Sequence, residues 1–230
     1  MTIPMRAGVI AITAVALGIG LSGCGSDTKT EGSATTSATS ETTASEAPST
    51  SAEAAGPSET IVDYIKENNI TETAVKPGDP GAPSIGLPAI PGWEDAGEAT
   101  PDWAYGAIMF TGDPSMAKDP PTIIAILSKL TGDVDQAKIL ELAPGEIQNL
   151  PDFEGPKTGK LSKFSGFDAT QIGGLYTKNG VNRMIAQKTV VIPGEDGLYV
   201  LQLNADGTED QAGPLMTATK AIDDQAKITP

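Results

Sequence analysis

The stretch ATQIGGLYTKNGVNRMIAQKTVVIPGEDGLYVLQL, residues 169–203, decides the fold of this chain. Asn179-Gly180 readily adopts the positive φ angles of a type I′ turn, and Pro193 to Gly197 is a second turn signal. These turns separate three segments rich in β-branched and other apolar residues: Ala169 to Thr177, Val181 to Ile192 and Leu198 to Leu203. The stretch therefore predicts three consecutive antiparallel strands.

Further strands are expected upstream of this stretch. Trp103 to Phe110 and Thr122 to Leu130 are short apolar runs bounded by Gly, Pro and Asp. Both predict strands, although the second run also fits a buried helix. The proline-rich stretch from Lys76 to Pro101 predicts loops with a short extended piece at Ser84 to Leu87.

Three helices are expected around these strands. Ser58 is a suitable N-cap for a helix over Glu59 to Asn68. Asp133 and Gln136 form a capping-box pattern for a helix over Val134 to Ala143, which Pro144-Gly145 would stop. Pro214 suits the first turn of a last helix, whose apolar face is Leu215, Ala218, Thr219 and Ile222. The fold class predicted is α+β, with a single antiparallel sheet flanked by helices.

The N-terminus has the layout of an export signal. Arg6 precedes an uncharged apolar run, Ala7 to Gly20, which is shorter than the roughly 20 residues that a membrane-spanning helix needs. Leu21-Ser22-Gly23-Cys24 follows and resembles the lipobox of bacterial lipoproteins, in which the cysteine sulfur receives a diacylglyceryl group. Residues 1–23 are therefore interpreted as a lipoprotein signal peptide and Cys24 as the lipid attachment site. The alternative is a secretory peptide that ends near a cysteine by chance.

A change of composition divides the rest of the chain at about residue 58. The 34 residues from Gly25 to Ser58 contain 16 Ser or Thr and seven Ala, a composition that cannot bury enough apolar surface to offset the entropy of ordering. Residues 24–58 are therefore predicted to be a lipidated, disordered tether, either O-glycosylated or unmodified. Residues 59–230 are long enough for one globular domain.

The charge is strongly acidic. Thirty Asp and Glu face 15 Lys and Arg, a net charge of −15. No basic footprint of a nucleic-acid binder is present. The acidity is expected to favour solubility beside a negatively charged surface.

No catalytic, metal or cofactor site is expected. The chain contains no histidine, and Cys24 is its only cysteine, which excludes histidine-based triads and the usual zinc sites. Ser115 to Lys118 matches S-x-x-K and Lys157 to Gly159 matches K-T-G, but Pro and Gly on both sides of Ser115 predict a loop there instead of a catalytic helix. Asn204 to Gly207 resembles part of a calcium loop, but Gly213 occupies the position of the bidentate acid, so a turn is expected. The chain is therefore predicted not to be an enzyme.

Two other features leave alternatives open. The neighbouring acids Glu94 and Asp95 suit a carboxylate hydrolase in principle, but solvated surface is the favoured interpretation for so acidic a chain. Gly173-Gly174 lies inside a predicted strand, where it indicates a bulge or the close approach of a ligand.

Blocks along the whole domain carry a family resemblance. They include Ile61 to Ile65, Gly78 to Pro83, Pro91-Gly92-Trp93, Trp103 to Ile108, Ser128 to Gly132, Gln171 to Gly174, Ala186 to Pro193 and Leu198 to Ala205. Together with the lipobox, these blocks resemble the mycobacterial LpqN/LpqT lipoprotein family. The resemblance implies a PsbP/Mog1-like fold. It also implies a role in envelope biogenesis through lipid-exporting transporters and trehalose-type glycolipids, or in host interaction, and it provides no catalytic residues.

Two functions are consistent with the resemblance. The first is a membrane-anchored accessory protein, on the extracytoplasmic face of the cell membrane, that binds an envelope glycolipid and works with a lipid-exporting transporter. The second is a scaffold or host-interacting, virulence-associated protein. For the first function the candidate ligand-binding residues are the aromatic side chains of Trp93, Trp103, Tyr105 and Tyr176. The alternative is that these rings belong to the hydrophobic core.

Overall fold

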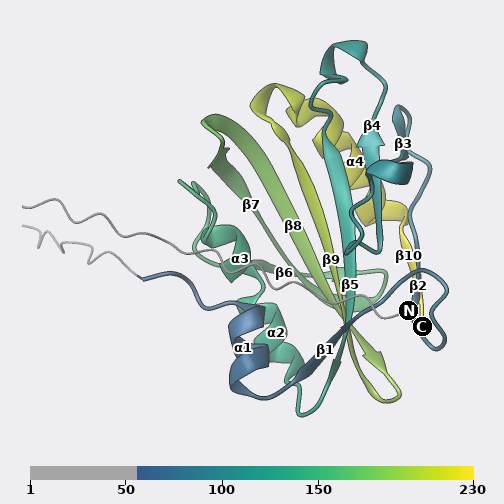
Figure 1. The fold of residues 1–230 in the computed structure, drawn as a ribbon, viewed down its shortest axis with the longest axis vertical. Helices are drawn as coiled ribbons and strands as arrows, with labels where there is room; N and C mark the ends of the chain where they lie inside the picture. The colour runs from purple at the N-terminus through teal and green to yellow at the C-terminus, as the bar shows by residue number, and fades with distance from the viewer. Residues whose placement is uncertain (1–55) are drawn as a thin grey trace, which may run out of the picture. The chain divides into compact units, whose positions relative to one another are not determined.

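Three long antiparallel strands lie next to one another in the large sheet, as residues 169–203 predict (Figure 1). The computed structural model describes residues 56–230. Its central strands are β7 (Phe167–Lys178), β8 (Val181–Gly194) and β9 (Gly197–Thr208). Asn179 and Gly180 between β7 and β8 have φ angles of 54° and 76°, as a type I′ turn requires.

The large sheet has eight strands, and all of its pairings are antiparallel. Its order is β3-β4-β5-β9-β8-β7-β6, and β1 pairs with β5 on the edge that β4 also uses. The remaining strands of this sheet are β1 (Thr71–Ala74), β3 (Trp93–Asp95), β4 (Gly106–Phe110), β5 (Thr122–Thr131) and β6 (Lys160–Phe164). A separate two-stranded sheet pairs β2 (Ser84–Gly86) with β10 (Lys227–Thr229).

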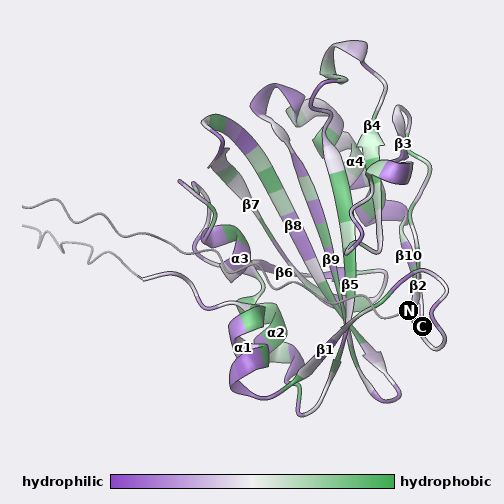
Figure 2. Cartoon of the chain, in the orientation of Figure 1, coloured by the Kyte–Doolittle hydropathy of each residue, from purple (hydrophilic) through white to green (hydrophobic). Residues whose placement is uncertain are grey.

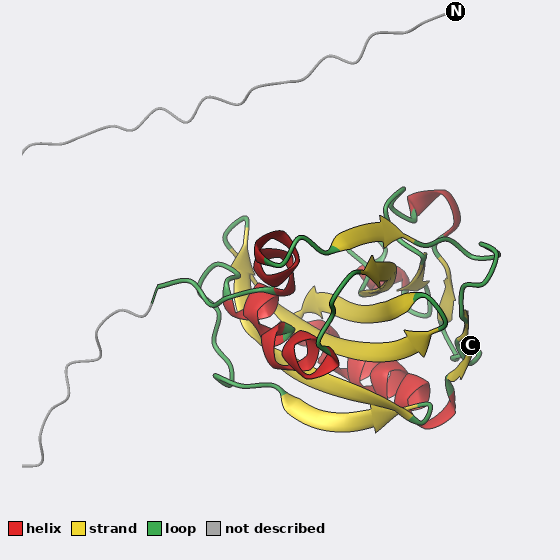
Figure 3. Ribbon diagram, turned by 90° about the horizontal axis from the view of Figure 1, so that it is seen from below, coloured by secondary structure: helices red, strands yellow, loops and turns green. Residues whose placement is uncertain are grey.

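Helices pack against the strands (Figure 3). The α-helices are α1 (Ile61–Glu67), α2 (Gln136–Leu142), α3 (Pro144–Gln148) and α4 (Ala212–Gln225). One-turn 3-10 helices form at η1 (Gly97–Ala99), η2 (Pro114–Met116) and η3 (Glu209–Gln211). Among residues 56–230, none of the helices combines the length and the apolar character that crossing a bilayer would require.

The alternation of β9 assigns the helices to opposite faces of the sheet. Leu198 and Val200 belong to a core cluster with residues of α1 and α2, whereas Leu201 and Leu203 belong to the cluster that contains the buried side chains of α4. Successive side chains of a strand point to opposite faces. The α+β class and the large antiparallel sheet are confirmed, but the prediction of a single sheet was wrong, because β2 and β10 pair separately. The apolar residues of β5 stand out in Figure 2.

The helix starts differ from those predicted. Thr60, not Ser58, caps α1: its Oγ1 accepts from the backbone N–H of Asp63 at 3.2 Å. Ser58 instead pairs through its backbone with the side chain of Asn149. Asp135, not Asp133, caps α2 by accepting from two backbone N–H groups. Several polar residues near a helix start satisfy the capping rule equally, so tertiary contacts decide among them.

One local prediction was confirmed and another was wrong. Helix α2 ends at Leu142, with Ala143 as its C-cap, as Pro144-Gly145 predicts, and Pro144 then starts the separate helix α3. A Cβ on Gly145 would lie 2.0 Å from the Glu59 carbonyl oxygen, so this glycine permits two backbone segments to approach closely. Asn204 to Gly207 does not form a turn, because these residues continue β9. Strands β1, β3, β6 and β10 were not predicted. Thr122–Thr131 is a strand and not a buried helix.

Candidate functional site

A row of small residues crosses the α4 face of the central strands. Gly173 of β7 pairs with Ala186 of β8, which pairs with Ala205 of β9. These three residues line the floor of an apolar cleft, together with Leu203 and Ile123. Because small side chains leave the pleated surface uncovered, the floor is recessed between its walls.

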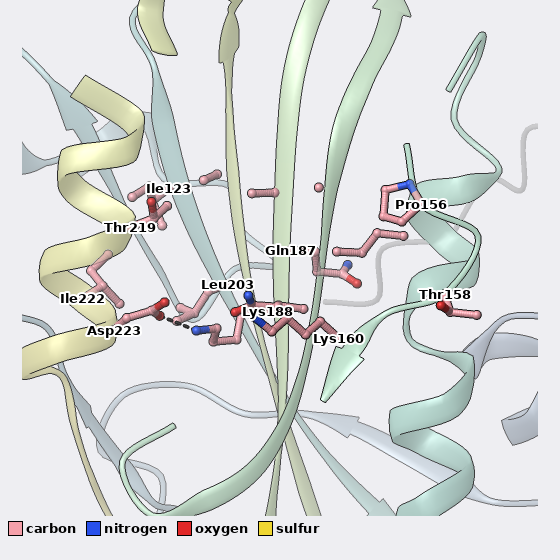
Figure 4. A pocket seen from close by; sticks show the side chains of 15 residues that line it. Ile123, Pro156, Thr158, Lys160, Gln187, Lys188, Leu203, Thr219, Ile222 and Asp223 are labelled. Carbon is pink, nitrogen blue, oxygen red and sulfur yellow. Dashed lines mark hydrogen bonds and ion pairs between the residues drawn. The ribbon is translucent and has the colours of Figure 1, made fainter. Parts of the chain in front are cut away.

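The walls of this cleft, hereafter the α4 cleft, come from segments far apart in the sequence (Figure 4). One wall is α4, which contributes Thr219, Ile222 and Asp223; the other is the segment Pro156 to Lys160 at the start of β6. The cleft has a volume of about 420 Å³. Ala186 is exposed to solvent on its floor while Ile222 is buried, so the cleft is open along one side and apolar at its base.

An ion pair marks the polar part of the cleft. Lys188 donates from Nζ to the Asp223 carboxylate (Figure 4) and lies over the Phe164 ring, 5.4 Å from its centroid. Its side chain is 12% exposed. Gln171 pairs with Lys188 across β7 and β8 and lines the same cleft. The α4 cleft therefore combines an apolar base with a charged pair and an amide, which suits an amphiphile better than a wholly apolar molecule.

A polar network occupies the other face of the sheet. Arg183 is 7% exposed and pairs with Asp206 at 2.6 Å and with Asp119 at 2.5 Å. Tyr176 donates its hydroxyl to Oδ2 of Asp206 at 2.5 Å. Burial, and then the hydrogen bond to the Asp206 carboxylate, raise the pKa of Tyr176 to about 12. Burial lowers the pKa of Arg183, but hydrogen bonds to Asp119 and Asp206 outweigh it and raise the pKa above its ordinary value.

The structure does not bring the four candidate aromatic residues together. Trp93 is buried and packs against Phe110 with ring centroids 5.7 Å apart, and Tyr176 belongs to the network around Arg183. Tyr105 is half-buried against the core, whereas Trp103 is 57% exposed. None of the four lines the α4 cleft. Their role in ligand binding stays a prediction, and Trp93 and Tyr176 occupy the positions of core residues.

The remaining sequence candidates have plain structural settings. Ser115 lies in the 3-10 helix η2, which ends before Lys118, so these residues do not form the helical S-x-x-K arrangement. Glu94 and Asp95 are exposed on the edge strand β3. Within residues 56–230 there is no group of His, Cys, Asp and Glu side chains that could hold a metal ion. Cys24 lies outside the described residues.

The glycine pair serves two different purposes. Gly173 lines the α4 cleft, whereas a Cβ on Gly174 would lie 2.4 Å from the Glu154 carbonyl oxygen. Close approach to Gly174 is therefore made by the chain itself, which pairs Glu154 with Leu175. Besides this pair, the sequence marked the cleft through the apolar face of the last helix, which contributes Thr219 and Ile222. Lys188 and Asp223 belong to no motif.

The fold and the cleft define a class: an α+β domain in which a large antiparallel sheet and a C-terminal helix enclose an apolar cleft. Residues 57–229 match the family model Lpp-LpqN, described as "Probable lipoprotein LpqN". The chain is 54% identical over 224 residues to "Lipoprotein LpqN" of Mycobacterium tuberculosis (strain ATCC 25618 / H37Rv), covering 96% of this chain and 97% of that protein. The chain therefore belongs to the Lpp-LpqN lipoprotein family, which implies association with a membrane or cell envelope.

Two further similarities extend this result. The "Proline-rich 28 kDa antigen homolog" of Mycobacterium leprae (strain TN) is 26% identical over 165 residues, which cover 72% of this chain and 58% of that protein. A solved structure, "Crystal structure of LpqN involved in cell envelope biogenesis of Mycobacterium tuberculosis", is 51% identical with a TM-score of 0.72. The match covers all of that chain and 76% of this one, the share that residues 56–230 make up. A relative's domain therefore folds without the preceding segment.

Proposed function

We propose that this chain is a membrane-anchored, non-catalytic lipoprotein of the cell envelope whose α4 cleft binds the apolar part of an envelope lipid. The expected ligand is a trehalose-type glycolipid, bound as a step in its transport by a lipid-exporting transporter. The family membership supports the lipoprotein part of this proposal. The solved relative, which is involved in cell envelope biogenesis, supports the envelope role. The PsbP/Mog1-like assignment of the fold stays a prediction.

The α4 cleft is the observation that carries the proposal. Ile123, Leu203 and Ala205 on its floor and Ile222 on its α4 wall offer apolar contacts. Its volume of about 420 Å³ lies within the usual range of small-molecule sites. Gln171, Thr219 and the Lys188–Asp223 pair border the same space. An acyl chain would lie along the apolar base, and sugar hydroxyls would exchange hydrogen bonds with these polar groups.

The anchor is proposed at Cys24, on the extracytoplasmic face of the membrane. Two acyl chains on its sulfur would hold the protein durably, at about 0.8 kcal/mol per buried methylene. Cys24→Ala is expected to move the protein from the membrane fraction into the medium, as shown by detergent-phase partitioning. Retention of this variant in the detergent phase would contradict the anchor.

Binding is best tested by filling the cleft. Ala186 is exposed on the cleft floor, so Ala186→Phe occupies the ligand space without displacing buried residues. The probe is a water-soluble trehalose monoester, titrated into residues 57–230 and monitored by methyl NMR of Ile222 and Leu203. Tryptophan fluorescence is less suitable because neither Trp93 nor Trp103 lines the cleft.

The expected result is saturable shifts of the cleft methyl groups and a loss of affinity of at least about tenfold in Ala186→Phe, equivalent to about 1.4 kcal/mol. The matched control is Ala74→Phe, which places the same side chain at an exposed position of β1 outside the cleft. Equal binding by Ala186→Phe and the control would exclude the α4 cleft, and no saturable shift in any methyl group would exclude lipid binding by this domain.

A further inference from the structure

Strand β6 is the free end of the large sheet. It pairs with β7 on one side, and no strand among residues 56–230 pairs with its other side. An edge strand presents N–H and C=O groups that another chain can use. Leu161, the second residue of β6, is 71% exposed, the most exposed of the large hydrophobic residues of the described domain. The edge is therefore both unpaired and locally apolar.

Clefts open on both sides of this edge. The α4 cleft lies on one face of the sheet and is bordered by Pro156, Thr158 and Lys160. A second cleft of about 360 Å³, hereafter the α3 cleft, is bordered by Thr158 and Leu161. Its other wall comes from α2 and α3 and includes Ala137, Leu140, Pro144 and Gln148. The segment that leads into β6 therefore separates two clefts, and Thr158 lines both.

This arrangement matches the geometry of strand addition. Successive side chains of a strand point to opposite faces of the sheet. A peptide added alongside β6 would therefore direct alternate side chains towards the α4 cleft and the α3 cleft. Main-chain hydrogen bonds contribute affinity in this mode of recognition, and pockets for alternate side chains contribute specificity.

The charge of the edge indicates the kind of peptide. Lys157, Lys160 and Lys163 lie within seven residues, and the run from Gly155 to Phe167 contains no acidic residue in a chain of net charge −15. Lys163 pairs with Asp168 at 2.7 Å, but within the described domain neither Lys157 nor Lys160 has a carboxylate partner within 4.0 Å. The lysines of the edge favour an acidic segment. Glu59 and Glu141 line the α3 cleft, so the apolar side chains of the segment are expected on that side and its carboxylates on the other.

We propose that the free edge of β6 binds an extended, acidic peptide segment of a partner protein, with apolar side chains at alternate positions, by strand addition. A second copy of this chain is disfavoured, because its own β6 edge would bring the same lysines into opposition. The chain's own residues 25–55 are acidic, but their apolar side chains are only alanines and Pro48, so they would fill the clefts poorly. This proposal does not depend on lipid binding by the α4 cleft.

The probe for the test is a fluorescein-labelled eight-residue peptide of alternating Glu and Val, with an alternating Lys and Val peptide as control. Fluorescence anisotropy measures binding to residues 57–230, and amide hydrogen exchange measures protection of β6. We expect saturable binding of the acidic peptide alone and slower exchange in Lys160–Phe164. Lys157→Glu combined with Lys160→Glu is expected to weaken binding by about tenfold or more.

The matched control is Lys118→Glu combined with Lys178→Glu, which changes the net charge equally at two exposed lysines outside both clefts. Equal weakening by the two double variants would overturn the proposal, since binding would then depend on total charge only. So would the absence of saturation up to roughly 1 mM peptide, or binding without protection of β6.

Two further measurements test the other occupants. Sedimentation equilibrium that shows a dimer broken by Lys157→Glu and Lys160→Glu would assign the edge to a second copy. Peptide binding to residues 57–230 that is abolished in residues 25–230 would assign the edge to the N-terminal segment. Either result replaces the partner protein as the occupant and rejects the proposal.

Discussion

Replacing Tyr176 with phenylalanine removes the only side-chain donor that the described domain offers to Oδ2 of Asp206. Arg183 donates through Nε and Nη2 to the other oxygen, Oδ1, at 2.9 and 2.6 Å, whereas the Tyr176 hydroxyl donates to Oδ2 at 2.5 Å. Phenylalanine retains the buried ring, so the substitution creates no large cavity. The change therefore isolates one hydrogen bond to a carboxylate.

The expected cost is about 1–2 kcal/mol. Hydrogen bonds to charged groups contribute about 1.5–3 kcal/mol to stability. The Asp206 side chain is 19% exposed, so water can replace part of the lost donor, which lowers the estimate. With a urea m-value of about 2 kcal/mol/M for a domain of this size, the unfolding midpoint should fall by about 0.5–1 M.

Urea unfolding of residues 57–230 is the assay, with the fluorescence of the buried Trp93 as the signal. Tyr105→Phe is the matched control, because within the described domain its hydroxyl makes no side-chain hydrogen bond, and it should change stability by less than about 0.5 kcal/mol. A loss in Tyr176→Phe no larger than in Tyr105→Phe would refute the reasoning. Unchanged glycolipid binding would assign Tyr176 to structure alone.

The same residue predicts a change of stability with pH. The pKa of Tyr176 is raised to about 12 in the folded protein, against about 10 for an unfolded tyrosine. Ionisation of Tyr176 is therefore less favourable in the native state than in the unfolded state. The contribution of the neutral Tyr176 to the free energy of unfolding is complete below pH 10 and is lost as the pH rises through 12. Tyr176→Phe should flatten this part of the stability profile, and an unchanged profile would assign the dependence to other groups.

Two further substitutions test the local structure. Gly174→Ala places a Cβ 2.4 Å from the Glu154 carbonyl oxygen and should lower the free energy of unfolding in urea by about 1–3 kcal/mol. The control is Gly106→Ala, whose Cβ would have no atom within 4 Å. Equal effects of the two substitutions would contradict the close approach at Gly174. Thr60→Ala removes the cap of α1, because the Thr60 Oγ1 accepts a hydrogen bond from the Asp63 N–H. The substitution should lower the free energy of unfolding by about 1 kcal/mol. Retained stability in Thr60→Ala would show that the cap contributes little.

Local sequence rules were sufficient wherever one segment contained its own signal. Asn179-Gly180 predicted a hairpin that the structure confirms, because only a few residues accept the positive φ angles of a type I′ turn. The same rules failed at Asn204 to Gly207, whose composition is typical of turns. Asp206 lies in β9, where Arg183 of β8 and Tyr176 of β7 satisfy its carboxylate.

The sequence alone determined the α+β class, the hairpins that join the three long strands and the acidic charge. These properties follow from composition, turn chemistry and alternation, which act between residues close in the chain. The family was indicated separately, by blocks of sequence that resemble it. Only the tertiary structure decided that Gly173, Ala186 and Ala205 lie in one row beneath α4 and that two clefts border β6. The physical reason is strand register: a shift of one residue reverses every side chain, and register depends on contacts between residues far apart in sequence.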